Sequence, residues 1–327
     1  MSTPTPSDKS LRVLLLGATG TAGQGVARAL VAAGHDVTCV VRSEAAREAL
    51  PRRAAVEVAT VTDAGDMARV FAPGRFDAVV SCLASRTGAP RDAWAIDHDA
   101  QLVALEMAKA SGVRQFVLLS AICVQKPLLE FQRAKLAFED KLKTSGLTWS
   151  IVRPTAFFKS LSGQIARVRA GKPFLLFGDG TLTACKPISD DDLGRFIAGC
   201  LTDPGKANRI LPIGGPGPAL TARQQGEALF EAAGMEPKFR RVPVAMMDAI
   251  IGLAAVLGRF SGTWADRAEF ARTGRYYATE SMLVWDAGAG RYDADATPEF
   301  GTDTLAQHYV RMIADGAEAD LREHAVF

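Results

Sequence analysis

The stretch that decides the fold reads Leu11-Arg12-Val13-Leu14-Leu15-Leu16-Gly17-Ala18-Thr19-Gly20-Thr21-Ala22-Gly23. Its mainly apolar first half is typical of a strand buried on both faces of a parallel sheet. Three glycines follow at the spacing GxxGxxG, and a helical pattern continues to Gly34. The first glycine allows a tight turn, the second lets a pyrophosphate approach the backbone, and the third lets helix and strand pack closely. We therefore predict a dinucleotide-binding turn rather than a plain strand–helix connection, with contacts from Gly17, Thr19, Gly20, Thr21, Ala22 and Gly23.

Strands and helices alternate outward from this turn over about 150 residues. We expect further strands at 36–41, 56–59, 78–81, 116–120 and 149–152, with helical segments at 44–50, 64–71, 93–111 and 128–144. Strict alternation predicts an α/β protein with a doubly wound parallel Rossmann sheet. We assign residues 11–155 to this dinucleotide-binding domain, with a returning segment at about 187–214, and residues 1–10 to a disordered lead.

The alternation breaks after Arg153-Pro154. A helix is expected at 161–170 and a short strand at 174–179. Ser189 is a plausible N-cap for a helix reaching residue 201, and 210–213 would return to the main sheet. The pattern is helical from residue 220, with one more strand at 282–285. We therefore expect a smaller, mostly helical substrate-binding lobe at the carboxyl ends of the strands, formed by residues 156–186 and 215–327.

Composition excludes several classes of protein. The 327 residues are 48% hydrophobic and 23% charged, which is ordinary for a soluble globular protein. A formal net charge of +2 gives no reason to expect a nucleic-acid partner. The five cysteines are scattered without a CxxC pair, and the four histidines lack metal-ligand spacing. We therefore predict no disulfide framework, no iron–sulfur cluster and no metal site.

The end of the second strand predicts which dinucleotide binds. Dinucleotide folds that bind a free ribose usually carry an acid there, whereas this chain has Arg42. A guanidinium is a good partner for a 2′-phosphate, so NADPH is the expected cofactor, unless Arg42 is only a surface charge. Asp63 follows the third strand, where it would either contact the adenine or cap a helix. Cys82 ends the fourth strand and should pass close to the cofactor.

The glycine spacing, Arg42, Ser120 and Lys135 together resemble the short-chain dehydrogenase/reductase superfamily, in its extended or atypical NmrA-like branch. Carbonyl-reducing members use Ser and Tyr-xxx-Lys, in which the tyrosine hydroxyl gives its proton to the substrate oxygen. Here Ser120 and Lys135 are the catalytic candidates, but Phe131 stands at the tyrosine position. The four tyrosines are at 276, 277, 292 and 309, and none has Lys four residues later. This leaves either a silent NADP-binding sensor or assembly protein, or a reductase of a conjugated C=C bond.

Residues 118–136, LLSAICVQKPLLEFQRAKL, closely resemble the divinyl chlorophyllide 8-vinyl reductases of plants and phototrophic bacteria. Residues 177–180 (FGDG) and 185–189 (CKPIS) do so as well. The resemblance implies NADPH-dependent reduction of the 8-vinyl group of a divinyl chlorophyllide or protochlorophyllide to ethyl. Charge left on the substrate would spread over the conjugated macrocycle, so a tyrosine acid is less needed. The alternatives are an isoflavone-reductase-like enzyme for another conjugated C=C bond and the silent NADP-binding sensor or assembly protein.

The same resemblance suggests roles for further residues. Lys135 would orient the nicotinamide ribose, and the proton would come from Lys135, Glu130 or water. Pro154 and Thr155 would contact the nicotinamide. Three aromatic residues would belong either to the core or to the pigment pocket: Phe131, Phe157 and Phe158.

The sequence also bears on where the protein is located in the cell. Residues 244–257 are apolar but too short to span a bilayer, which needs about 20 residues. They would form core, a lid over a flat pigment, or a shallow membrane contact. We expect a cytoplasmic protein of a phototrophic bacterium, because no transit segment precedes Leu11, and any magnesium would arrive inside the pigment.

Overall fold

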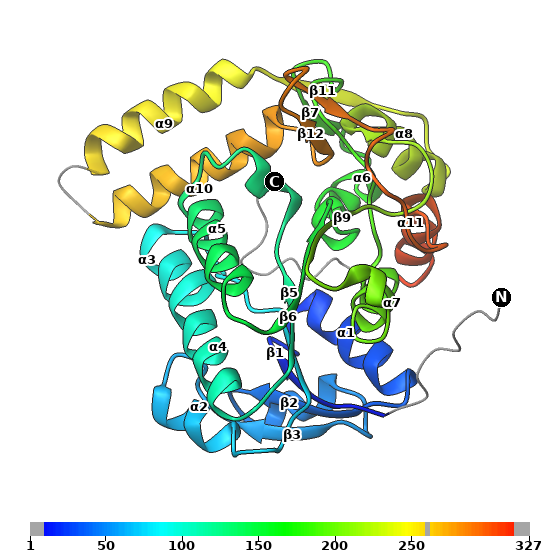
Figure 1. Cartoon of the computed structure of the whole chain (residues 1–327). Coiled ribbons are helices and arrows are strands. Elements are labelled where there is room, and N and C mark those ends of the chain that lie inside the picture. Colours follow the sequence, from blue (N-terminus) through cyan, green and yellow to red (C-terminus); the bar gives the residue numbers. More distant parts are fainter. Residues whose placement is uncertain (1–9, 259–261, 317–327) are drawn as a thin grey trace.

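The computed structural model describes residues 10–258 and 262–316, so residues 1–9 of the expected lead lie outside it. Seven parallel strands form the central sheet, in the order β3-β2-β1-β4-β5-β6-β9 (Figure 1). Their bounds are β1 Arg12–Leu16, β2 Asp36–Val41, β3 Ala55–Val58, β4 Ala78–Ser81, β5 Gln115–Leu119, β6 Thr148–Pro154 and β9 Arg209–Ile213. The predicted Rossmann sheet is confirmed, and β9 is the segment expected to return to it.

Helices cover both faces of the sheet (Figure 1). Successive side chains of a strand point to opposite faces, so β1 contributes to two cores. Val13 and Leu15 pack with α1 (Thr21–Ala32) and α7 (Asp190–Gly199), whereas Leu14 and Leu16 pack with the helices of the other face. Those helices are α2 (Ala64–Val70), α4 (Gln101–Ala110) and α5 (Glu130–Lys143). The side chains of Val13, Leu14, Leu15 and Leu16 are fully buried, each contributing about 1.5–3 kcal/mol.

Three expected helices differ from the prediction in kind or length. Residues 44–50 form a 3₁₀ helix, Glu44–Ala49. The helix expected at 93–111 is a continuous stretch that contains a π-helical segment, Trp94–Ala100, between α3 (Pro90–Ala93) and α4. The helix expected at 161–170 is split into a 3₁₀ turn, Lys159–Leu161, and α6, Ile165–Arg169. Ser162 explains the split, because its hydroxyl donates to the backbone oxygen of Phe158 and so competes with helical hydrogen bonds.

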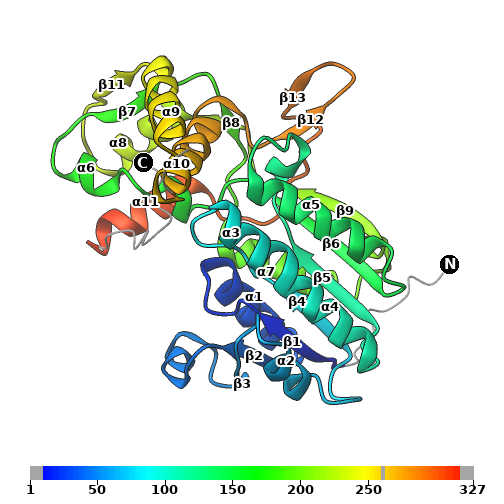
Figure 2. The same ribbon diagram turned by 90° about the vertical axis from the view of Figure 1, so that its left-hand side faces the viewer.

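The second lobe follows β6 and lies at one end of the sheet (Figure 2). Its helices are α6, α8 (Ala222–Ala232), α9 (Val244–Gly258), α10 (Gly262–Thr279) and α11 (Leu305–Ala314). The described residues of this lobe also form three two-stranded sheets. The sequence patterns predicted strands at only two places in it, 174–179 and 282–285. The sheets pair β7 (Phe174–Phe177) with β11 (Phe239–Val242), β8 (Ala184–Cys185) with β10 (Leu220–Thr221), and β12 (Val284–Asp286) with β13 (Arg291–Asp293).

Helix α9 contains the apolar residues 244–257 and packs along α10 (Figure 1). Met246 on α9 is 51% exposed. Within residues 10–258 and 262–316, no helix combines the length and the apolar character needed to cross a bilayer. The three roles considered for residues 244–257, namely core, lid and membrane contact, stay predictions.

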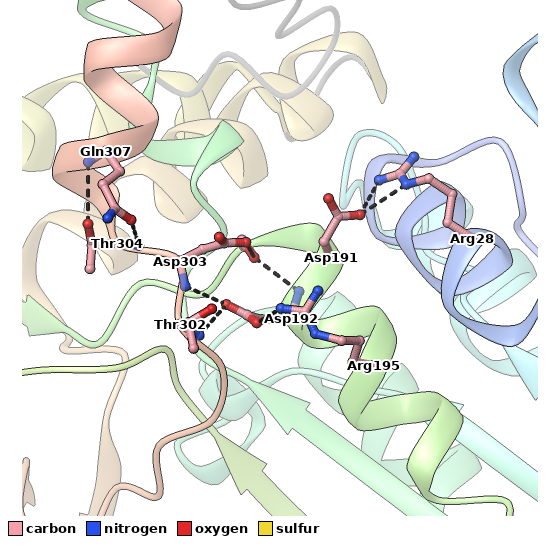
Figure 3. Close-up of polar contacts among 9 residues, drawn as sticks. Arg28, Asp191, Asp192, Arg195, Thr302, Asp303, Thr304 and Gln307 are labelled. Carbon is pink, nitrogen blue, oxygen red and sulfur yellow. Dashed lines mark hydrogen bonds and ion pairs between the residues drawn. The ribbon is translucent and has the colours of Figure 1, made fainter. Parts of the chain in front are cut away.

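The N-terminus of α7 binds the segment that leads into α11 (Figure 3). Ser189 caps α7 as predicted, because its hydroxyl accepts from the backbone N–H of Asp192 at 3.0 Å. The fully buried Asp192 carboxylate accepts from the backbone N–H groups of Thr302 and Asp303 at 3.2 and 3.0 Å. Ser189 in turn donates to the Asp303 carboxylate at 2.7 Å. These bonds fix the segment that leads into α11.

Candidate active site

The three glycines of the first turn differ in whether the fold itself requires glycine at that position. Gly17 has φ +73°, and a Cβ there would lie 2.5 Å from the backbone oxygen of Cys82. A Cβ on Gly23 would lie 2.1 Å from the oxygen of Gly17. A Cβ on Gly20 would meet nothing closer than that same oxygen at 3.5 Å, an ordinary contact. The fold therefore requires the first and third glycines, whereas Gly20 is exposed and its position would accept a Cβ.

The start of helix α1 suits an anion. Gly20 is its N-cap and offers no side-chain hydrogen bond to the first turn, which carries no acidic residue. The first N–H groups of any helix lack intrahelical partners and carry partial positive charge. Thr19, Thr21 and Ala22 stand beside them, so the predicted contact residues are adjacent in space. This donor set fits the pyrophosphate of a dinucleotide.

The residues predicted at the adenosine end are only partly free to bind. Arg42 follows β2 and is exposed, and within the described part of the chain no hydrogen bond or ion pair of its side chain is found. Asp63 caps α2, because its carboxylate accepts from the backbone N–H of Asp66 at 2.9 Å. The capping role considered for Asp63 is therefore confirmed, and its contact with the adenine stays a prediction.

Cys82 lies beside the glycine turn through its backbone, as expected from the end of β4. Burial raises the pKa of its thiol to about 12. The side chain is therefore a neutral thiol at physiological pH rather than a thiolate nucleophile.

Lys135 forms a buried ion pair that sequence patterns did not reveal. Its Nζ lies 2.8 Å from Oδ1 of Asp97, and the two side chains are 10% and 0% exposed. Asp97 belongs to the π-helical segment, and its carboxylate also faces the backbone N–H of Ser85 at 3.3 Å. A buried ammonium needs such a counter-charge. The pair holds Lys135 in one position beside the ends of β4 and β5.

Ser120 makes a separate polar cluster. Its hydroxyl donates to Oε1 of Glu139 at 2.6 Å, and Arg153 donates from Nε to the same oxygen at 3.1 Å. The Glu139 side chain is fully buried. Both predicted catalytic side chains are thus paired with buried carboxylates, but with different ones, and their catalytic roles stay predictions.

Phe131 packs in a cluster that joins the two lobes. This cluster includes Ile122 and Cys123 from the loop after β5, and Tyr276 and Tyr277 from α10. The backbone N–H of Glu130, at the start of α5, donates to the carboxylate of Glu269 on α10 at 3.1 Å. The sequence carried no signal for this contact, because Glu130 and Glu269 are far apart in the chain, on α5 and α10.

The loop after β6 is bound largely to the protein itself. The Thr155 hydroxyl donates to the backbone oxygen of Lys186, and Thr155 N donates to Ile213 at 2.9 Å. Phe157 follows the end of β6 and is partly buried against the core on the α1 face of the sheet. Phe158 is 4% exposed in the core of the second lobe, with its ring centroid 5.3 Å from that of His308. Phe158 therefore has the surroundings of a core residue, and its predicted pocket role is untested.

Comparison with known proteins identifies the family. A family model described as NAD(P)H-binding matches residues 17–204. A protein of Oryza sativa subsp. indica named divinyl chlorophyllide a 8-vinyl-reductase, chloroplastic, is 49% identical over 333 residues. The match covers 96% of this chain and 82% of that protein. This chain belongs to the divinyl chlorophyllide a 8-vinyl-reductase family. It is an NAD(P)H-binding protein of the oxidoreductase type, as its motifs predicted.

Solved structures agree on the fold of this reductase family member. An NADPH-dependent quinone oxidoreductase from Escherichia coli, complexed with NADPH, has a TM-score of 0.67 at 18% identity, covering 92% of this chain and 99% of that one. Leucoanthocyanidin reductase from Vitis vinifera has a TM-score of 0.67 at 18% identity, covering 93% and 99%. At such identities the likeness establishes the Rossmann-type architecture and nothing about substrate.

Proposed function

We propose that this chain reduces the 8-vinyl group of divinyl chlorophyllide a, or of divinyl protochlorophyllide a, to an ethyl group with NADPH. The observation that carries the proposal is the similarity of 49% identity over 96% of the chain to a reductase of that name. The site is compatible with it, because Phe131 replaces the tyrosine acid that carbonyl reduction requires.

The cofactor would be held at three places. The N–H groups at the start of α1 would bind the pyrophosphate, with Gly20 leaving room for it. Arg42 would bind the 2′-phosphate, which favours NADPH over NADH. Lys135 would orient the nicotinamide ribose from the position that Asp97 gives it. When bound, NADPH supplies the hydride.

The chain's own contribution to the reaction is mainly positioning. The Lys135–Asp97 pair carries no net charge, so Lys135 can bind hydroxyl groups without leaving an unpaired charge in the interior. Phe131 offers an apolar surface on which a flat macrocycle would pack, and Pro154 and Thr155 would border the nicotinamide. The negative charge formed on the substrate is delocalised by its own conjugated ring, which reduces the demand for an oxyanion site.

The decisive experiment mixes the purified protein with NADPH and either divinyl pigment. Loss of the conjugated vinyl group should shift the Soret band, and the matched monovinyl pigment should show no shift. A silent NADP-binding sensor and an isoflavone-reductase-like enzyme both predict an unchanged spectrum. A protein that binds NADPH but shifts neither pigment would contradict the proposed function.

Two further features remain predictions from the sequence. One is a cytoplasmic location in a phototrophic bacterium, in peripheral contact with the membranes where such pigments gather. Flotation with liposomes, with and without pigment, checks that contact, and absence of co-migration would count against it. The other is the choice between chlorophyllide and protochlorophyllide, which the two pigment assays compare directly.

A further inference from the structure

Reduction of a vinyl group needs a proton as well as a hydride. The inference about the source of that proton rests on the proposed function. Lys135 and Glu130 are the two side chains that the family resemblance suggested beside water. Transfer from the Lys135 ammonium would leave the Asp97 carboxylate buried without its counter-ion, since that carboxylate is 0% exposed and 2.8 Å from Nζ. The ion pair therefore opposes a proton-donating role for Lys135.

Glu130 is equally unsuited to donate a proton. Its carboxylate accepts from the indole N–H of Trp94 at 3.2 Å and forms an ion pair with Arg133. These contacts, the Trp94 hydrogen bond first, hold the pKa of Glu130 below its usual value. At neutral pH the group is an ionised carboxylate that has already lost its proton.

The structure brings a tyrosine to the place where the sequence seemed to lack one. Tyr277 of α10 packs against the same cluster as Phe131 and Cys123, so the second lobe contributes a tyrosine to the cluster that contains the residue replacing the usual acid. Tyr276 fixes this part of α10, because its hydroxyl donates to the backbone oxygens of Cys123 and Lys126 at 2.9 and 3.2 Å. The two tyrosine rings meet edge to face, with centroids 5.8 Å apart. The Tyr277 hydroxyl interacts with the Cys123 thiol.

The surroundings keep the Tyr277 hydroxyl protonated. Burial raises its pKa well above the usual value, with Cys123 and Tyr276 adding to the effect. A neutral phenol can give a proton to a strongly basic carbanion.

We propose that Tyr277, contributed by the second lobe, is the general acid that protonates the inner carbon of the vinyl group. Hydride addition to the terminal carbon forms one C–H bond and moves the electron pair of the C=C bond onto the inner carbon and the macrocycle. The O–H bond of Tyr277 breaks, and its proton forms the second C–H bond. The phenolate then takes a proton from water, so each turnover consumes one hydride from NADPH and one proton from solvent.

The test compares Tyr277→Phe with the matched variant Tyr276→Phe in the full-length protein. Tyr277→Phe should lower kcat by about 100-fold or more while leaving the KM for pigment and the Kd for NADPH within about threefold. It should also change the solvent deuterium isotope effect and the pH profile of kcat, which a structural role would leave unchanged. Tyr276→Phe loses two hydrogen bonds to backbone and should lower the melting temperature more than Tyr277→Phe does.

The outcomes separate this inference from the proposed function. A wild-type protein that reduces the pigment, with a Tyr277→Phe variant that is folded and equally active, would overturn the role of Tyr277 alone. A Tyr277→Phe variant that is inactive and has also lost binding of pigment and NADPH would overturn it too, since that result is structural. A wild-type protein without turnover would refute the proposed function and this inference with it.

Discussion

Replacing Gly20 by alanine separates what the fold needs from what the cofactor needs. The added Cβ would lie 3.5 Å from the nearest protein atom, the Gly17 oxygen, so the native structure accepts it. Alanine is a poorer N-cap than glycine by roughly 0.5–1 kcal/mol. It also restricts the unfolded chain, which returns about 0.4–1 kcal/mol. The free energy of unfolding should therefore change by no more than about 0.5 kcal/mol.

The same methyl group would occupy the space through which a pyrophosphate approaches α1. Overpacking of this kind costs about 1–3 kcal/mol, which corresponds to a loss of roughly 5- to 150-fold in NADPH affinity. Binding can be measured by calorimetric titration and stability by thermal unfolding without cofactor.

Gly23→Ala is the matched control, because its Cβ would lie 2.1 Å from the Gly17 oxygen. This variant should lose about 3 kcal/mol or more of stability, which corresponds to about 4 °C or more in melting temperature for a chain of 327 residues. The reasoning fails if Gly20→Ala binds NADPH like the wild type, or if Gly20→Ala and Gly23→Ala unfold at the same temperature.

Three other substitutions test single contacts. Arg42→Asp should weaken binding of NADPH by about 10- to 100-fold but leave NADH affinity unchanged, and equal losses in both Kd values would contradict a 2′-phosphate site. Lys135→Met should lower the free energy of unfolding by about 3–5 kcal/mol, and adding Asp97→Leu should restore most of it in denaturant titrations; a further loss would refute the buried pair. Burial raises the pKa of Asp190 to about 6, so the folded state favours its neutral acid. The resulting penalty is absent near pH 4, grows up to pH 6 and is complete above it, so Asp190→Asn should stabilise by roughly 2–3 kcal/mol at pH 8 and not at pH 4. Asp191→Asn is the exposed control, and an equal pH-dependent gain there would show that net charge, not burial, is responsible.

Local patterns predicted the parts of the site that lie close together in the sequence. The glycine turn, Arg42 and the Ser189 cap each depend on a few neighbouring residues, and the structure places them on the elements expected. The helix at 93–111 was predicted as regular, and its π-helical segment was not foreseen. An extra residue per turn changes which side chains face inward, so the contact between Asp97 and Lys135 did not follow from helical periodicity.

The sequence by itself determined the sheet, the dinucleotide turn, the family and the absence of a Tyr-xxx-Lys motif, because each is written in adjacent residues. Only the tertiary structure decided how the charges and hydroxyl groups pair. Asp97 meets Lys135, Glu139 meets Ser120, and Tyr277 comes to lie in the cluster of Phe131. The physical reason is that buried charges and hydroxyl groups must pair with whatever the packed core brings near them, and α10 contacts the start of α5 only through the packing of the second lobe. The Tyr-xxx-Lys motif lacks its tyrosine at Phe131. Helix α10, which begins more than 120 residues after Phe131, contributes Tyr277 to the cluster that contains Phe131.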